Sequence, residues 1–295
     1  MQSADFLSAV FFYLKEGENL NQNWIVENLN NAFSTWNGKL GELWGLVTTG
    51  PQTFKGGAVW SVMQTLHNGM VGIGYALVVL FFAISLCKNT MNFHELKRPE
   101  AAIHYLIRFV AAKALVGYGM DIMLNVFSIC NGIVTDMANN MGGISEAMVS
   151  LPAEMQTAIE NVGFLASIPL WLVTILGSLF ITVLSFVMIL TVYGRFFRLY
   201  MYTALAPLPL AAFAGESTQS VGISFLKSYV GVCLEGAVIV LACVIYSAFV
   251  STPTVISGEA TTIVWSYLAE TVFNMLVLVG LIKGSDRIIH EMMGL

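Results

Sequence analysis

The sequence predicts an all-α fold: a polytopic bundle of transmembrane helices with about five crossings, one proline-broken re-entrant or in-plane element and an N-terminal amphipathic helix. Hydrophobic residues make up 57% of the 295 positions and charged residues only 11%, whereas a soluble domain carries about 25% charged residues. Several apolar runs reach the roughly 20 residues with which a helix crosses a bilayer core. The net charge of −5 argues against a nucleic-acid-binding surface, which is normally basic.

An amphipathic helix is predicted before the first membrane span. Apolar residues recur there at spacings of three and four, the period of a helix: Ile25, Leu29, Phe33, Trp36, Leu40, Leu43 and Val47. The opposite face is rich in Asn and acidic residues, so attraction to anionic lipid headgroups is not the expected driving force. We predict instead that the helix docks on a partner or lies along the outer surface of the membrane, within an extracytoplasmic arm formed by residues 1–60.

The remaining residues, 61–295, are predicted to form one transmembrane helical domain. Five apolar stretches are long enough to span the membrane: Gly69–Cys87, Ala101–Cys130, Gly163–Tyr193, Tyr229–Val250 and Ile263–Ile282. Basic residues gather at one set of span ends: Lys88, Lys97, Arg98, Arg108, Arg195, Arg198, Lys227, Lys283 and Arg287. Acidic residues gather at the other: Asp136, Glu146, Glu154, Glu160 and Glu259. Because Lys and Arg mark the cytoplasmic side, we predict a multi-pass protein of the plasma (inner) membrane, with the N-terminus outside and the C-terminus in the cytoplasm.

A sixth apolar stretch, Leu199–Gly215, is predicted not to cross the membrane. The basic residues before and after it, Arg195 and Lys227, place both of its ends on the cytoplasmic side. Pro207 and Pro209 break the helix, because each lacks a backbone N–H and clashes with the preceding turn. We therefore expect a re-entrant or in-plane element that is buried against other helices or other subunits. The alternative is a sixth crossing, which would put the C-terminus outside.

Polar residues also occur inside the predicted spans, where ionisable groups are costly and usually face protein or water. They are Lys113, Asp121 and Asn125 in the second span, Glu235 in the fourth and Glu270 in the fifth. The first three, with Gly117, follow one another at steps of four and form a polar stripe along one side of the helix. One interpretation is a water-lined path or a seam between subunits. The other is a set of internal ion pairs in which Lys113 is neutralised by Glu235 or Glu270.

The sequence contains no pattern that indicates catalysis. The four histidines show no metal-ligand spacing, and the four cysteines lie in or at the ends of apolar runs. No phosphate-binding loop, His-Glu-x-x-His motif or Gly-x-Ser-x-Gly motif occurs. We therefore expect no catalytic residue, no metal, no cofactor and no enzymatic activity.

Two stretches carry a resemblance to a known family. One runs from Gly56 to Leu66 and leads into the first span. The other combines Arg195-Phe196-Phe197-Arg198, Ala206-Pro207-Leu208-Pro209-Leu210-Ala211, a polar turn at Gly215–Ser220 and Phe225-Leu226-Lys227. Together they resemble the TrbL-type family of polytopic inner-membrane subunits of conjugative type IV secretion systems, in particular the short forms found in mobile elements of Gram-positive bacteria. The similarity covers roughly residues 50 to 290.

This resemblance implies a channel-platform role in the plasma membrane. Members of the family assemble as homo-oligomers. They contact other membrane subunits of the secretion system and membrane lipids, and they frame the path of single-stranded DNA with its attached relaxase. Separate ATPases supply the energy. We hypothesise that Arg195, Arg198 and the element around Pro207 and Pro209 form the cytoplasmic face of the assembly.

Two other functions stay open on the sequence. One is a secondary transporter or ion channel for a small solute. Transporters often contain broken helices in two related halves, whereas this sequence has one broken element and no second half that matches it. The other is a structural membrane scaffold that binds a partner through the N-terminal arm.

Overall fold

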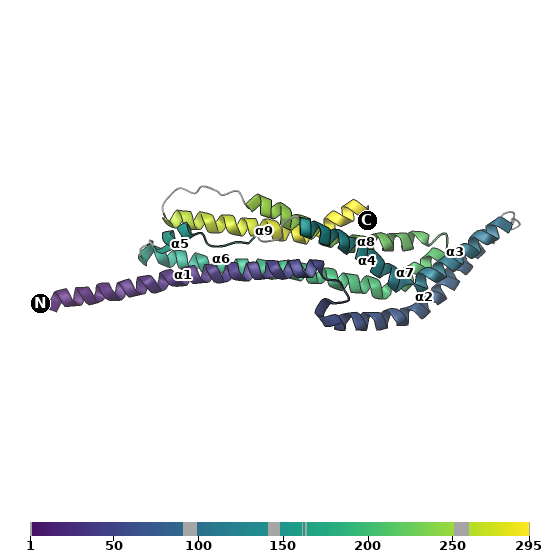
Figure 1. Cartoon of the computed structure of the whole chain (residues 1–295), viewed down its shortest axis with the longest axis horizontal. Helices are drawn as coiled ribbons and strands as arrows, with labels where there is room; N and C mark the ends of the chain where they lie inside the picture. The colour runs from purple at the N-terminus through teal and green to yellow at the C-terminus, as the bar shows by residue number, and fades with distance from the viewer. Residues whose placement is uncertain are drawn as a thin grey trace. The chain divides into compact units, whose positions relative to one another are not determined.

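The computed structural model describes residues 2–90, 99–140, 148–160, 162, 164–250 and 260–294. Within these residues the chain forms α-helices and short 3₁₀ helices and no strand (Figure 1), which confirms the all-α prediction. The elements are α1 Gln2–Thr48, η1 Phe54–Gly57, α2 Ala58–Thr90, α3 Pro99–Gly117, α4 Gly119–Asn140, α5 Ala153–Glu160, α6 Phe164–Leu205, α7 Pro207–Ala211, η3 Ala212–Ala214, α8 Gln219–Val250 and α9 Ala260–Met293.

The structure offers four to five candidate crossings, which is consistent with the predicted number of about five. Four helical segments in the described residues are long and apolar enough to cross a membrane: Phe54–Lys88, Ser167–Leu205, Gln219–Val250 and Thr262–Met293. A bent pair, Ile103–Gly117 followed by Gly119–Asn139, meets the same test when its two helices, which meet at 71°, are taken as one span. The bend falls at Tyr118, between two glycines, and glycine weakens a helix because it leaves the backbone free.

The third predicted span is longer than expected. The sequence analysis ended this span at Tyr193, before the two arginines, but α6 continues to Leu205. Arg195 and Arg198 therefore lie inside the helix, and the proline pair follows it directly. Four of the residues used to orient the spans, Lys97, Arg98, Glu146 and Glu259, lie outside the described residues, as does Gly163. The arm of residues 1–60, the domain of residues 61–295 and the direction of the termini stay predictions, because helix packing does not identify the sides of a membrane.

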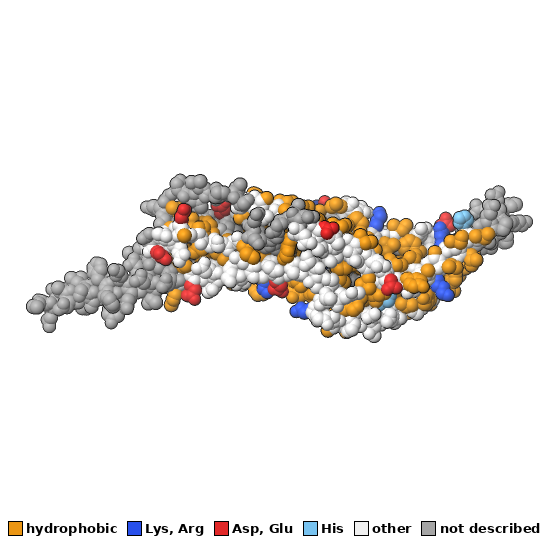
Figure 2. Space-filling view, in the orientation of Figure 1, with side chains coloured by type: hydrophobic (Ala, Val, Ile, Leu, Met, Phe, Trp, Pro, Cys, Tyr) orange, Lys and Arg blue, Asp and Glu red, His pale blue; other side chains and the backbone are white. Residues whose placement is uncertain are grey.

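The chain divides into two compact units, and several helices contribute residues to both. The first is drawn from Met1–Gly45, Met141–Thr191 and Leu241–Lys283, the second from Leu46–Asn140, Val192–Val240 and Gly284–Leu295. Large hydrophobic side chains are exposed on many of the spans. Figure 2 shows such side chains gathered over α2 and α3. An exposed apolar surface of this kind is what lipid or another membrane subunit covers.

In the first unit, the apolar stripe of α1 is buried by the chain itself. Ile25, Leu29, Trp36 and Leu40 have no exposed surface, and the ammonium of Lys39 lies 5.7 Å from the centre of the Phe186 ring of α6. The amphipathic helix was predicted correctly. The expectation that its apolar stripe docks on a partner or on the membrane surface was wrong. The stripe instead packs against helices of the same chain, since they offer the apolar surface that it needs.

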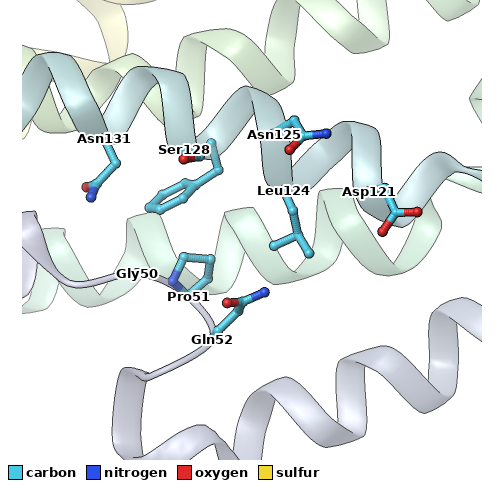
Figure 3. Close-up of a pocket in the computed structure, with 9 residues that line it drawn as sticks. Gly50, Pro51, Gln52, Asp121, Leu124, Asn125, Ser128 and Asn131 are labelled. Atoms are coloured by element: carbon cyan, nitrogen blue, oxygen red, sulfur yellow. The ribbon is translucent and has the colours of Figure 1, made fainter.

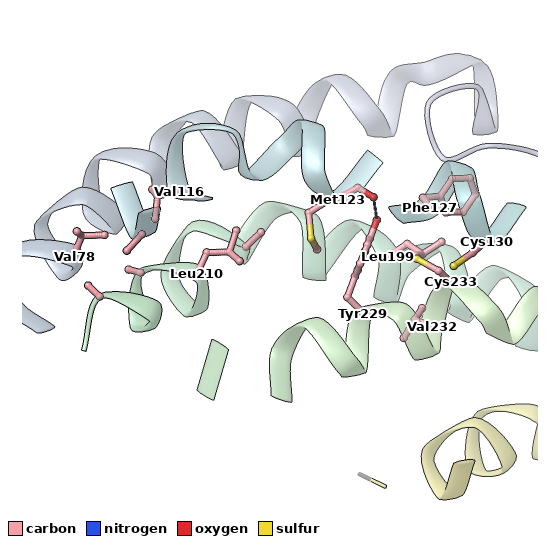
Figure 4. Packing of buried hydrophobic residues seen from close by; sticks show 14 residues of the cluster. Val78, Val116, Met123, Phe127, Cys130, Leu199, Leu210, Tyr229, Val232 and Cys233 are labelled. Carbon is pink, nitrogen blue, oxygen red and sulfur yellow. Dashed lines mark hydrogen bonds between the residues drawn. The ribbon is translucent and has the colours of Figure 1, made fainter. Parts of the chain in front are cut away.

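In the second unit, a hydrophobic core gathers residues from α2, α3, α4, α6, α7 and α8 (Figure 4). The short helix α7 contacts both α2 and α3. Gly74 of α2 makes this approach possible, because a Cβ at position 74 would lie 2.9 Å from the carbonyl oxygen of Pro207 and 2.9 Å from Cγ1 of Val116. Pro207 and Leu210 are buried and Pro209 is half-buried. The proline-broken element is therefore packed among helices of the chain, as predicted.

A buried histidine replaces a hydrogen bond that the prolines remove. In a continuous helix the carbonyl of Thr203 would accept a bond from the N–H of residue 207, but residue 207 is proline and has no N–H. His67 of α2, which is 2% exposed, places Nδ1 2.7 Å from this carbonyl oxygen. Since a carbonyl can only accept, Nδ1 carries the proton and donates it. His67 thus satisfies a buried backbone acceptor at the point where α6 ends.

We expect His67→Phe to lower the stability of the full chain by about 1–3 kcal/mol, because a buried carbonyl loses its donor. The measurement is the thermal unfolding midpoint of the purified protein in detergent. His104→Phe is the control, since His104 is exposed and its replacement should shift the midpoint little. Adding Pro207→Ala to His67→Phe should recover part of the loss, because alanine at position 207 supplies the missing N–H. Equal midpoints for the wild type and the three variants would show that the hydrogen bond between His67 and Thr203 does not contribute to stability.

Candidate functional site

The first polar site of the second unit is built around Arg195, whose side chain is completely buried. Its guanidinium donates to three backbone carbonyl oxygens: Nε to Val232 at 3.3 Å, Nη2 to Cys233 at 3.2 Å and Nη1 to Val47 at 3.5 Å. Gly236 of α8 leaves the space for this group, because a Cβ at that position would lie 2.8 Å from the guanidinium carbon. A buried charge requires such compensation.

Arg198, one turn further along α6, joins three helices. Its Nη2 donates to both carboxylate oxygens of Glu235 in α8, at 2.7 and 2.8 Å, and its Nη1 lies 2.5 Å from Oδ1 of Asp286 in α9. Ser285 adds a hydroxyl bond of 3.3 Å to Glu235, whose side chain is 1% exposed. Two arginines and two carboxylates therefore form a cluster whose formal charges cancel.

This cluster corrects one interpretation of the sequence. Glu235 is neutralised by Arg198, and not by Lys113, which the ion-pair interpretation considered as its partner. The buried side chain of Arg195 is turned toward backbone carbonyls of its own chain, and its place on the cytoplasmic face of an assembly stays a prediction. Because α6 runs past the two arginines, their charges are satisfied inside the bundle.

The second polar site is a hollow of about 530 Å³ beside α4 (Figure 3). The loop at Gly50, Pro51 and Gln52 lies on one side, and residues 121–131 of α4 lie on the other. Asp121, Asn125 and Ser128 are exposed. Asn131 donates through Nδ2 to the carbonyl of Thr48 at 3.4 Å, while its buried Oδ1 accepts no hydrogen bond from the described residues. The hollow is thus lined mainly by amides, a hydroxyl and one carboxylate.

The structure keeps part of the predicted polar stripe and breaks the rest. Asp121 and Asn125 line the hollow together with Ser128 and Asn131, which continue the same face at helical spacing and which the sequence analysis missed. Lys113 is exposed on α3, beyond the 71° bend, and is not part of the hollow. Gln52 carries no sequence signal, because a loop residue far away along the chain cannot be placed by periodicity.

Glu270 belongs to neither site. It lies in α9 within the first unit and is half-buried. One turn earlier on the same helix, the hydroxyl of Tyr267 donates to the carbonyl of Ser150 at 3.0 Å. In the part of the chain that the structure describes, no group of three or more His, Cys, Asp or Glu side chains could hold a metal ion.

The exposed face of α4 can hydrogen-bond to water or to a polar partner, within a segment that is long and apolar enough to cross a membrane.

Comparison with known proteins gives a family match. Residues 36–207, more than half of the chain, match the family described as TrbL/VirB6 plasmid conjugal transfer like protein. No curated protein and no solved structure matches the sequence.

We expect Glu235→Ala to lower stability by about 3 kcal/mol, because it leaves Arg198 part-buried with one carboxylate in place of two. The matched control is Glu291→Ala, which removes the carboxylate of the exposed pair with Arg287 and should cost less than about 1 kcal/mol. Thermal unfolding of both variants in detergent checks this. A loss at position 235 no larger than that at position 291 would contradict the structural role given to the cluster.

Proposed function

The chain belongs to the TrbL/VirB6 family of plasmid conjugal transfer proteins, and on this premise we propose that it is a channel-platform subunit of a conjugative type IV secretion system. Four to five apolar helices and the family together make it a multi-pass inner-membrane component of conjugal transfer. The family also implies other subunits of the same system. The finer role that we propose is to frame the path of single-stranded DNA with its attached relaxase across the plasma membrane, as a homo-oligomer and without enzymatic activity of its own.

The observation that supports this proposal is the exposed polar face of α4. Asn125 and Ser128 lie in the second half of the segment Ile103–Asn139, where a lipid-facing helix would carry apolar side chains. Ile129, next to Ser128 in sequence, is 69% exposed. The helix therefore presents a polar face and an apolar face, and one side of it is suited to water while the other is suited to lipid.

The chemistry of the hollow suits passage of a polyanion. Among the described residues that line it there is no Lys or Arg, and the one charged group is the carboxylate of Asp121, which does not bind phosphate. A path with many basic groups would instead hold phosphates by releasing their counterions, which makes binding tight. Amides and hydroxyls keep a path wet without gripping the strand. ATPases of the secretion system would supply the energy, since we found no phosphate-binding loop in the sequence.

The test compares two faces of α4 in donor cells, in a background where Cys87, the exposed cysteine among the four, is replaced by serine. We expect Asn125→Cys and Ser128→Cys to react with a water-soluble maleimide, because a thiol reacts as the thiolate and needs water to ionise. Ile129→Cys is the matched control and should stay unlabelled, since its face meets lipid.

A photo-crosslinking side chain at position 125 should capture the transferring strand, whereas the same side chain at position 129 should not. Labelling at position 125 without capture of DNA would favour a small-solute channel. If position 125 were neither labelled nor crosslinked, the framing role would be lost and the scaffold function would remain.

A further inference from the structure

Two exposed charges of opposite sign stand in the middle of the bent span. Lys113 lies on α3 and Asp121 on α4, and both side chains are exposed. Asp121 is halfway along the segment Ile103–Asn139. Neither makes an ion pair with any of the described residues, whereas Arg108 pairs with Glu216 and Arg198 with Glu235. Asp136 is also exposed and in no ion pair among the described residues, but it lies close to the end of the segment, three residues before Asn139. Lys113 and Asp121 are thus the unpaired charges on either side of the bend.

The two charges are too far apart to neutralise one another within the chain. They are eight residues apart, whereas side chains on a helix pair at a spacing of three or four residues, and α3 and α4 also diverge by 71° between them. A charge at the centre of a bilayer costs about 2.5–3.5 kcal/mol even by the lower scales. Each of these side chains therefore needs a partner outside the chain or contact with water.

The surroundings of Lys113 favour a protein partner over open water. Val110 and Leu106, one and two turns before it on α3, are 57% and 59% exposed. A single ammonium in an exposed apolar face is suited to a packed interface in which one opposite charge meets it. Asp121, at the end of the α4 polar face nearest to the bend, offers a charge of that kind.

We propose that a second copy of this chain covers this face, with Lys113 of one copy paired to Asp121 of the next. The argument is one of charge complementarity: each copy carries one cation and one anion on two different surfaces. A head-to-tail contact repeated around a closed ring satisfies every such charge. A lipid phosphate could neutralise Lys113 only, but a second copy brings the partner for both. The pairing deepens the proposed function and rests on its homo-oligomeric assembly.

Charge reversal tests the pairing in the full chain. We expect Lys113→Glu and Asp121→Lys, each alone, to reduce the assembled particle to monomers in mild detergent, as measured by native mass spectrometry. The double variant Lys113→Glu/Asp121→Lys should restore the particle, because the pair is re-formed with the signs exchanged. Asp136→Lys is the control, since Asp136 is exposed on the same helix and has no assigned role; it should leave the particle intact.

Disulfide formation tests the contact without a change of charge sign. In the Cys87→Ser background, chains with Lys113→Cys and chains with Asp121→Cys carry different tags and are oxidised together in membranes. A mixed disulfide dimer is expected, and Asp136→Cys in place of Asp121→Cys should give none. The disulfide experiment tests the pairing even if the reversed-charge variants do not insert into the membrane.

The outcomes separate this pairing from the proposed function. If single reversals leave the particle intact, or if the double variant stays dispersed while no mixed disulfide forms, the pairing is overturned. If single reversals leave the particle intact but abolish DNA transfer, the two charges act along the path, and the channel-platform role stands without this seam. A protein that stays monomeric in membranes, with wild-type sequence and active transfer, would overturn both.

Discussion

The buried guanidinium of Arg195 is the constraint on which the packing of the second unit depends. Its three carbonyl acceptors belong to two other helices, the end of α1 and the middle of α8, so α6 has one position in which all three are reached. Gly236 is the residue that admits it. One turn away, Arg198 forms an ion pair with Asp286 and so links α9 to the same group of helices. Because a buried charge without acceptors is so costly, these helices cannot slide against one another, and the core around α7 forms within this fixed register.

The same logic accounts for the proline-broken element. Prolines at membrane depth free backbone carbonyls, which have no water to accept from and must find donors in the protein. His67 supplies one to Thr203, and a bond from Leu210 N–H to the carbonyl of Ala206 closes the first turn of α7. Gly74 lets the element approach α2 closely. The element is thus held by ordinary rules of hydrogen-bond satisfaction and packing, in a unit whose helices are registered by charge.

Local signals in the sequence were sufficient for the fold class and insufficient for the sites. Run length predicted the spans, a period of 3.6 predicted the buried stripe of α1, and Pro207 with Pro209 predicted the break after α6. Partners that are distant along the chain were out of reach: nothing local connects Arg195 with the carbonyl of Val232, or Gln52 with α4. The end of α6 was placed too early because two arginines in an apolar run usually mark its end. Here the fold satisfies them inside the bundle, and the helix continues.

The polar residues of the spans therefore fall into two physical classes, although the sequence presents them alike. Arg195 and Glu235 are buried and Arg198 is half-buried, and all three are hydrogen-bonded within the chain, so they fix the register of the helices. Asn125 and Ser128 on one face, and Lys113 with Asp121 near the bend, are exposed and bring polar or charged groups to an outer surface of the bundle. A subunit that only had to span lipid would gain nothing from the second class and would bear its full desolvation cost. Exposed polar groups next to a core that is held in register by buried charges are expected of a membrane protein whose surface also contacts water and other subunits.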